Sequence, residues 1–210
     1  MVEPGAAPLD KYQHPHFARV YLQISKSAEK GGAAAHRQRL LAGLSGRVIE
    51  LGAGNGLNFK HYPDSVTEAL AVEPDDVLRA HAETAAVRAS VPIRVVPGHA
   101  DALPAEEAHF DAAVASLVLC SVPDPGTALA ELYRALRPGG ELRFYEHVRS
   151  DRRWVGRMED LVAPLWSRAC GGCHPNRDTL AAIRAAGFEI SRVEPIRFGL
   201  LHMLGRASRA

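Results

Sequence analysis

The run Cys170-Gly-Gly-Cys173-His174 has the most recognisable spacing for chemistry in this sequence. A Cys-x-x-Cys-His run can attach a c-type haem, form a redox-active cysteine pair or supply half of a zinc site. Covalent haem attachment belongs to exported proteins, and the opening residues MVEPGAAPLDKYQHPH contain no apolar core of a secretory signal. A closed structural zinc site needs four cysteine or histidine ligands, and Cys120 stands apart in the sequence with no histidine near it.

We therefore interpret this run first as a glycine-containing turn whose cysteines are small apolar residues. A metal or redox protein that uses Cys170 and Cys173 is the remote alternative, and we expect no metal site.

The composition is that of one globular domain. The chain has 210 residues, 47% hydrophobic and 23% charged, with a formal net charge of +1; this length is enough to bury a sizeable core. The arginines are scattered, so no nucleic-acid partner is expected. No apolar run approaches the roughly 18 residues of a membrane span, which predicts a soluble, cytoplasmic protein without a membrane anchor. The composition does not indicate an oligomeric state.

Strands and helices are expected to alternate along the central part of the chain. Apolar runs rich in β-branched residues predict strands, and the segments between them show helical periodicity. The expected strands are 47–51, 68–72, 92–98, 110–119 and 141–147, and the expected helices are 75–90 and 127–138. This order predicts an α/β fold with a doubly wound, mostly parallel sheet that is covered on both faces.

Two further segments are expected to lie outside that core. Residues 1–43 predict an N-terminal helical lid, and residues 149–186 predict a helical cap inserted after the fifth strand. Residues 188–195 and 200–207 are expected to form a last hairpin at the edge of a mixed sheet, so residues 1–210 make a single domain. The insertion leaves from the carboxyl edge of the sheet, where ligands bind in open α/β folds.

A glycine-rich turn follows the first expected strand directly. The run Glu50-Leu-Gly52-Ala-Gly54-Asn-Gly56 differs in spacing from the G-x-G-x-x-G fingerprint of dinucleotide sites, which speaks against the rival hypothesis of a nicotinamide-dependent oxidoreductase. Its glycines let the backbone approach a ligand closely. Glu73 ends the second strand, where an acidic side chain can accept hydrogen bonds from both ribose hydroxyls.

The run VIELGAGNGLNF, followed later by AVEP, resembles the cofactor site of class I S-adenosylmethionine-dependent methyltransferases. Three further runs occur in the same order as in that family: GHADALP, FDAAVASLVLCSV and LYRALRPGGELRFYEH. The resemblance implies a seven-stranded Rossmann-like fold, S-adenosyl-L-methionine as the cofactor and S-adenosyl-L-homocysteine as its product. It places the adenine near residues 99–103, although His99 stands where the family usually has Asp or Asn. Asn58 is assigned to the cofactor's carboxylate or, alternatively, to a helix cap. The cofactor-binding residues are then Gly52, Ala53, Gly54, Gly56, Asn58, Glu73, Pro74, His99, Ala100, Asp101, Ser116 and Leu117.

A narrower resemblance extends into the insertion. The runs NFKHYP, LVLCSV, LRPGG and EHV, followed by Trp154, Pro164, Trp166, Cys173 and Arg177, are similar to the methyltransferase-like enzymes of vertebrates that methylate alkyl thiols. Those enzymes carry an N-terminal membrane anchor, which this chain does not show. The resemblance implies a small-molecule thiol as the methyl acceptor, and O- or N-methylation of a small metabolite is the alternative.

His147 is the candidate catalytic base, because it ends the fifth strand at the reactive edge and imidazole titrates near neutrality. The alternative is a buried histidine that orients the insertion. A base of modest strength suffices for a thiol, which is a strong nucleophile once ionised. The candidates for contact with the acceptor are Tyr21, Cys120, Trp154, Trp166 and Cys173; ordinary packing roles are the alternative for each of them.

Overall fold

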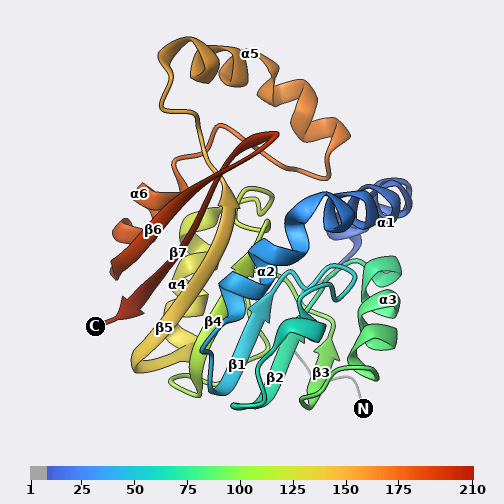
Figure 1. The fold of residues 1–210 in the computed structure, drawn as a ribbon, viewed down its shortest axis with the longest axis vertical. Coiled ribbons are helices and arrows are strands. Elements are labelled where there is room, and N and C mark those ends of the chain that lie inside the picture. Colours follow the sequence, from blue (N-terminus) through green and yellow to red (C-terminus); the bar gives the residue numbers. More distant parts are fainter. Residues whose placement is uncertain (1–8) are drawn as a thin grey trace.

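A seven-stranded sheet forms the centre of the structure, a computed structural model that describes residues 9–210 (Figure 1). Its strand order is β3-β2-β1-β4-β5-β7-β6. Strands β1 to β5 pair in parallel, and β7 runs antiparallel to both β5 and β6. The strands are β1 (Gly46–Leu51), β2 (Val66–Val72), β3 (Ile93–Val96), β4 (Phe110–Ser116), β5 (Leu136–His147), β6 (Phe188–Phe198) and β7 (Leu200–Arg209). The predicted mixed sheet with a terminal hairpin is confirmed.

Six α-helices accompany the sheet within residues 9–210. They are α1 (Pro15–Ala28), α2 (Ala34–Leu41), α3 (Asp76–Ala86), α4 (Pro125–Ala135), α5 (Arg153–Ala169) and α6 (Thr179–Ala185). Short helical turns lie at Asp10–Tyr12, Glu29–Ala33 and Phe59–His61. Gly32 interrupts the path from α1 to α2 with a positive φ of 119°, so the two helices diverge there.

The sheet buries both of its faces, as its apolar strands predict. Neighbouring residues of β1 belong to different cores: Val48 packs with α2 and α3, whereas Ile49 packs with α4 and α6. In the same way, Val114 and Ala115 of β4 face opposite sides. This alternation follows from the two-residue period of a strand and explains why central strands without polar alternation are stable here.

Aspartate caps fix where three of the helices begin. Asp75 accepts hydrogen bonds from the N–H groups of Val77 and Leu78 at 3.0 and 3.1 Å, which starts α3 directly after β2. Asp124 accepts from Gly126 N at 2.9 Å, with Pro125 at the first position of α4. Asp178 caps α6 in the same manner. Each cap satisfies amide groups that have no partner inside the helix.

Several boundaries differ from the sequence expectations. Helix α4 ends at Ala135 rather than at residue 138, and β5 begins at Leu136 rather than at residue 141. Strand β4 ends at Ser116 rather than continuing to residue 119, because Leu117 adopts a left-handed backbone with φ of 57° and turns the chain away from the sheet. The segment 149–186 was predicted to be one cap, but only α5 lies over the carboxyl ends of the strands (Figure 1). Helix α6 instead covers the sheet face, where Ile183 is fully buried in the core.

Helices α1 and α5 therefore flank the carboxyl edge of the parallel strands (Figure 1). Within residues 9–210, none of the helices has both the length and the apolar character needed to cross a bilayer.

A buried carboxyl group links β1 to the loop that follows it. Glu50 is 1% exposed, and its two oxygens accept hydrogen bonds from Asn58 Nδ2 and the Tyr62 hydroxyl, each at 2.7 Å. Burial raises the pKa of Glu50 to about 7, and these two hydrogen bonds oppose the rise. The folded state therefore binds a proton at Glu50 more tightly than the unfolded chain does.

The pKa of Glu50 is 4.5 in the unfolded chain and about 7 in the folded protein. The stability that proton binding at Glu50 contributes is therefore complete below pH 4.5 and is lost as the pH rises through 7. We predict that Glu50→Gln, which cannot ionise, gains stability relative to the wild type by on the order of 3 kcal/mol between about pH 5 and pH 8. Urea unfolding at a series of pH values measures this difference. Glu68→Gln, at an exposed position of β2, is the matched control, and a difference that stays constant with pH would contradict the prediction.

Candidate active site

The glycine turn after β1 is packed so closely that side chains are excluded from it. Gly52 and Gly56 have φ of 66° and 75°. A Cβ atom on Gly52 would collide with the Val118 side chain, and one on Gly56 would lie 2.8 Å from Ala85. The turn thus lies against the loop after β4 on one side and against α3 on the other, as expected for a backbone that must come near a ligand.

Glu73 lies beside this turn at the end of β2. Glu73 is 5% exposed, and its carboxylate accepts hydrogen bonds from Gly54 N at 2.7 Å and from Asp75 N at 3.0 Å. Burial raises the pKa of Glu73 to about 7, against the effect of these two backbone hydrogen bonds. The structure therefore brings the predicted glycines and the predicted acidic residue into direct contact.

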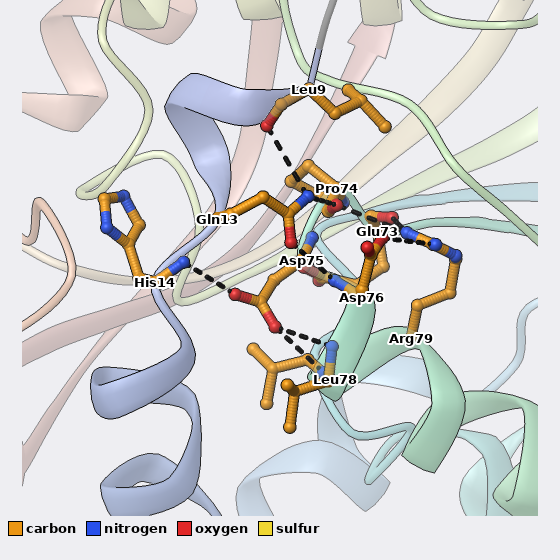
Figure 2. Close-up of polar contacts among 10 residues, drawn as sticks. Leu9, Gln13, His14, Glu73, Pro74, Asp75, Asp76, Leu78 and Arg79 are labelled. Carbon is orange, nitrogen blue, oxygen red and sulfur yellow. Dashed lines mark hydrogen bonds and ion pairs between the residues drawn. The ribbon is translucent and has the colours of Figure 1, made fainter.

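The residues before α1 lie across the ends of β2 and α3 (Figure 2). The Gln13 side chain donates to Pro74 O at 2.8 Å and accepts from Asp76 N at 3.0 Å. The backbone N–H of His14 donates to Asp75 Oδ2 at 2.9 Å. These polar contacts fix the start of α1 against the same β2–α3 turn that carries Glu73.

Tyr12 covers the residues assigned to the adenine. Its ring stacks on His99 with a centroid separation of 5.1 Å, and its hydroxyl donates to Asp101 Oδ2 at 2.7 Å. The other carboxylate oxygen, Asp101 Oδ1, is buried without a hydrogen-bond partner among residues 9–210. Ala100 is buried in the core next to them. A buried acceptor without a donor is unusual and marks a position where a ligand can donate.

Arg37 is a buried residue that the sequence patterns did not reveal. It donates to Asn58 Oδ1 at 3.0 Å and Ser116 Oγ at 3.1 Å, and it pairs with Glu29 at 2.9 Å. The Tyr21 ring stands 3.6 Å from the Cβ position of Gly54, and the neighbouring guanidinium opposes the burial that raises the pKa of Tyr21. A cation thus joins the predicted residues Asn58, Ser116 and Tyr21 next to the glycine turn.

Leu117 and Ala53 are held in this region by backbone hydrogen bonds. Leu117 N donates to Tyr145 O at 2.7 Å, which holds the left-handed turn after β4. Ala53 is buried below the glycine turn, where its N–H donates to Val72 O at 3.1 Å.

A second cluster lies at the ends of β4 and β5. The Sγ atoms of Cys120 and Cys173 are 3.7 Å apart, and His147 Nδ1 lies 3.5 Å from the first and 3.4 Å from the second. Cys120 and Cys173 are buried. Fifty-three positions separate the two cysteines in the chain, so the sequence expectation that Cys120 stands apart from other thiols and histidines does not hold in space. Cys170 does not belong to this cluster.

Backbone hydrogen bonds hold the cluster in place. The fully buried carboxylate of Glu146 accepts from the N–H groups of residues 118, 119 and 120 at 2.9, 2.9 and 3.2 Å. His174 N donates to Cys120 O at 2.7 Å, and Arg177 donates to Leu119 O and Val122 O at 2.7 Å each. The CGGCH turn is thereby attached to the loop after β4.

The glycines of the CGGCH turn permit this attachment. A Cβ atom on Gly172 would lie 2.9 Å from Ser121 O, and one on Gly171 would collide with the Phe17 ring of α1. Both glycines have positive φ, of 86° and 58°. The predicted glycine-containing turn is thus present, and its cysteine Cys173 faces a thiol and an imidazole.

The two thiols of the cluster ionise differently. The hydrogen bond between Cys173 and Cys120, together with the nearby His147, holds the pKa of Cys173 below its ordinary value, although burial acts in the opposite direction. The hydrogen bond with Cys173, and then burial and the nearby Glu146, raise the pKa of Cys120. The first proton lost from the pair therefore leaves Cys173.

The two tryptophans of α5 lie in different surroundings. Trp154 is 69% exposed, whereas Trp166 is less exposed and reaches Cys173, whose pKa it helps to lower. Other apolar side chains of the same helix are exposed as well: Met158, Leu161, Val162 and Leu165. The structure thus brings Trp166 to the thiol cluster but not Trp154.

Comparison with known proteins assigns the chain to a family. A family described as methyltransferase domain matches residues 49–144. The human protein named thiol S-methyltransferase TMT1B is 32% identical over 219 residues, which cover 95% of this chain and 87% of the relative.

Solved structures of methyltransferases share the fold. An S-adenosylmethionine-dependent methyltransferase from Thermotoga maritima is 21% identical, with a TM-score of 0.66 over 93% of this chain and 100% of that one. A methyltransferase from Bacillus halodurans is 13% identical, with a TM-score of 0.70 over 84% and 98% of the two chains.

The chain therefore belongs to the class I S-adenosylmethionine-dependent methyltransferases and is similar, over nearly its whole length, to the thiol S-methyltransferases within that family.

Proposed function

We propose that this enzyme transfers a methyl group from S-adenosylmethionine to the thiol of a small molecule. The observation that carries the proposal is the similarity, over 95% of the chain, to a protein named a thiol S-methyltransferase. The thiol–imidazole cluster at the ends of β4 and β5 supports it, because its polar atoms lie at the edge of the sheet where acceptors bind in open α/β folds.

The residues present fit the cofactor's nucleoside. When bound, S-adenosylmethionine supplies a methyl group on a sulfonium sulfur, which is already activated for transfer. We propose that Glu73 accepts hydrogen bonds from the ribose hydroxyls after its contact with Gly54 N is exchanged. The unpartnered Asp101 Oδ1 is an acceptor for the amino group of adenine, and His99 and Ala100 flank it. Pro74 keeps the turn after Glu73 in place through its carbonyl.

The amino-acid end of the cofactor is proposed to lie over the glycine turn. There the glycines leave room near Ala53, and Arg37 offers a buried cation next to Asn58 and Ser116. A guanidinium binds a carboxylate through two parallel hydrogen bonds, which makes it a stronger partner than the amide of Asn58 by itself. Arg37 is thus the principal proposed ligand of the cofactor's carboxylate.

The N-terminal segment 1–43 is proposed to act as a lid, and the structure describes residues 9–43 of it. Tyr12 covers the adenine residues, and Tyr21 covers Gly54. Because both side chains come from the segment fixed by Gln13 and His14, the cofactor is shielded from water when the segment is closed. Leu117 forms the opposite wall through its left-handed turn.

His147, Cys120 and Cys173 are proposed as the acceptor-side residues, with Trp166 beside them. A thiol with a pKa near 8.5 is only a few per cent ionised at neutral pH, so a group that favours the thiolate accelerates its methylation. Trp154 is not included in the acceptor pocket, because its side chain is 69% exposed.

We predict that Glu73→Ala weakens the binding of S-adenosylhomocysteine roughly tenfold to a hundredfold, because two charge-assisted hydrogen bonds to the ribose are lost. Isothermal titration calorimetry measures the dissociation constant. Glu68→Ala, at the exposed start of the same strand, is the control and keeps the wild-type affinity. Absence of binding to the wild-type protein would overturn the proposed cofactor site.

Arg37 and Glu73 are expected to recognise different parts of the ligand. We predict that Arg37→Met weakens S-adenosylhomocysteine roughly tenfold but leaves the binding of 5′-methylthioadenosine, which lacks the amino acid, unchanged. Glu73→Ala should weaken both ligands. If Arg37→Met weakened both equally, Arg37 would have a structural role instead of a role in carboxylate binding.

The acceptor class is tested with ethanethiol, phenol and a primary amine of similar size, each with S-adenosylmethionine. We predict methylation of the thiol at a rate far above that of the other two, because the thiolate is the strongest nucleophile of the three at neutral pH. Mass spectrometry of the methylated product gives the rate. Methylation of phenol without methylation of the thiol would replace the thiol proposal with O-methylation.

A further inference from the structure

We propose that Cys120, His147 and Cys173 form a binding site for one zinc ion, whose open fourth position receives the sulfur of the acceptor thiol. The metal site itself is independent of the proposed function. Its role toward the acceptor rests on that function.

The three donor atoms already have the spacing of a zinc site. Tetrahedral zinc with Zn–S of about 2.3 Å and Zn–N of about 2.1 Å requires S···S of about 3.8 Å and S···N of about 3.6 Å between its ligands. The structure has 3.7 Å between the two Sγ atoms, and 3.5 and 3.4 Å from them to His147 Nδ1. The ion therefore fits with shifts of a few tenths of an ångström.

The ligands come from three separate elements whose backbones are fixed without a metal. Glu146 holds the amides around Cys120, His147 ends β5, and the CGGCH turn is fixed by the hydrogen bond from His174 N to Cys120 O. Gly172 lets that turn approach the carbonyl of Ser121. A site that is organised before the metal arrives has a small entropic cost of binding.

The donor set selects a soft or borderline metal. Two thiolates and one imidazole suit zinc, whereas magnesium and calcium prefer oxygen ligands. Two thiolate charges also neutralise a divalent cation, so the buried cluster would carry no net charge. Among residues 9–210, the group has three protein ligands. Three protein ligands with one open position are typical of catalytic zinc, since structural zinc has four.

The open position gives the metal a chemical role. A thiol that binds zinc loses its proton, here to solvent, and remains nucleophilic as a thiolate at neutral pH. The acceptor sulfur then forms a bond to the methyl carbon while the bond from that carbon to the sulfonium sulfur breaks, and the electron pair of the broken bond stays on the departing sulfur. The resulting thioether is neutral and binds zinc weakly, which favours its release. In this scheme His147 is a zinc ligand and not a proton acceptor.

Metal analysis of the full chain, purified with a phosphine reductant and without a chelator, tests the site. We expect about one zinc per chain in the wild type, and loss of the metal in Cys120→Ser and Cys173→Ser. Cys170→Ser, the third cysteine and the matched control, should keep its zinc, because Cys170 lies outside the cluster. A wild type that stays free of zinc after incubation with zinc chloride, or equal loss in Cys170→Ser, would overturn the site. Circular dichroism verifies that each variant folds.

Cobalt substitution tests the open position. The cobalt protein should show the absorption of a tetrahedral thiolate site, and ethanethiol should shift that spectrum whereas ethanol should not. A spectrum that ethanethiol does not change would overturn the role toward the acceptor.

The methylation assay separates this proposal from the proposed function. If the zinc-free protein methylates ethanethiol as fast as the zinc protein, the role of zinc is overturned and the thiol function stands. If zinc binds but no thiol is methylated, the metal site stands and the thiol function fails. We expect neither result. Instead, removal of zinc should lower the rate of ethanethiol methylation at least tenfold, and added zinc should restore that rate.

Discussion

The buried carboxylate of Glu146 is the interaction on which the reactive edge depends. The chain must leave β4 abruptly at Leu117, which exposes three successive amides to an apolar interior. Glu146, from the neighbouring strand, accepts hydrogen bonds from all three. Burial raises the pKa of this carboxyl group, and the amides oppose the rise. The loop is stable because the buried carboxylate and the buried amides satisfy each other's hydrogen bonds. That exchange, together with the hydrogen bond from His174 N to Cys120 O, fixes the position of Cys120 relative to His147.

The two halves of this edge are built by different means. On the side proposed for the cofactor, glycines let the turn after β1 pack against Val118 and Ala85, and Glu73 and Arg37 are the charged residues beside it. On the side proposed for the acceptor, the turn after α5 brings Cys173 onto the loop that carries Cys120. The sheet unites the two because parallel strands place their carboxyl ends at a common edge.

Most of the fold and part of the candidate site could be predicted from the sequence. Strand and helix order, the glycine turn and Glu73 follow from local patterns, which depend on periodicity and on the special backbone of glycine. Arg37 could not be predicted, because an arginine in a short polar helix has the pattern of a surface residue, and only tertiary packing buries it. The meeting of Cys120 with Cys173 is a long-range contact between a strand end and a turn, and no local pattern encodes it.

Electrostatics at the strand ends favours a cationic ligand. Glu50, Glu73 and Glu146 are buried near the carboxyl ends of β1, β2 and β5, and burial raises the pKa of each. A sulfonium charge nearby stabilises their ionised forms and is stabilised by them in turn. After methyl transfer the sulfur is neutral, so this attraction would disappear while the proposed hydrogen bonds to ribose and carboxylate would persist. With the cofactor in the proposed place, the same carboxyl groups would favour binding of the reactant cofactor over retention of its product.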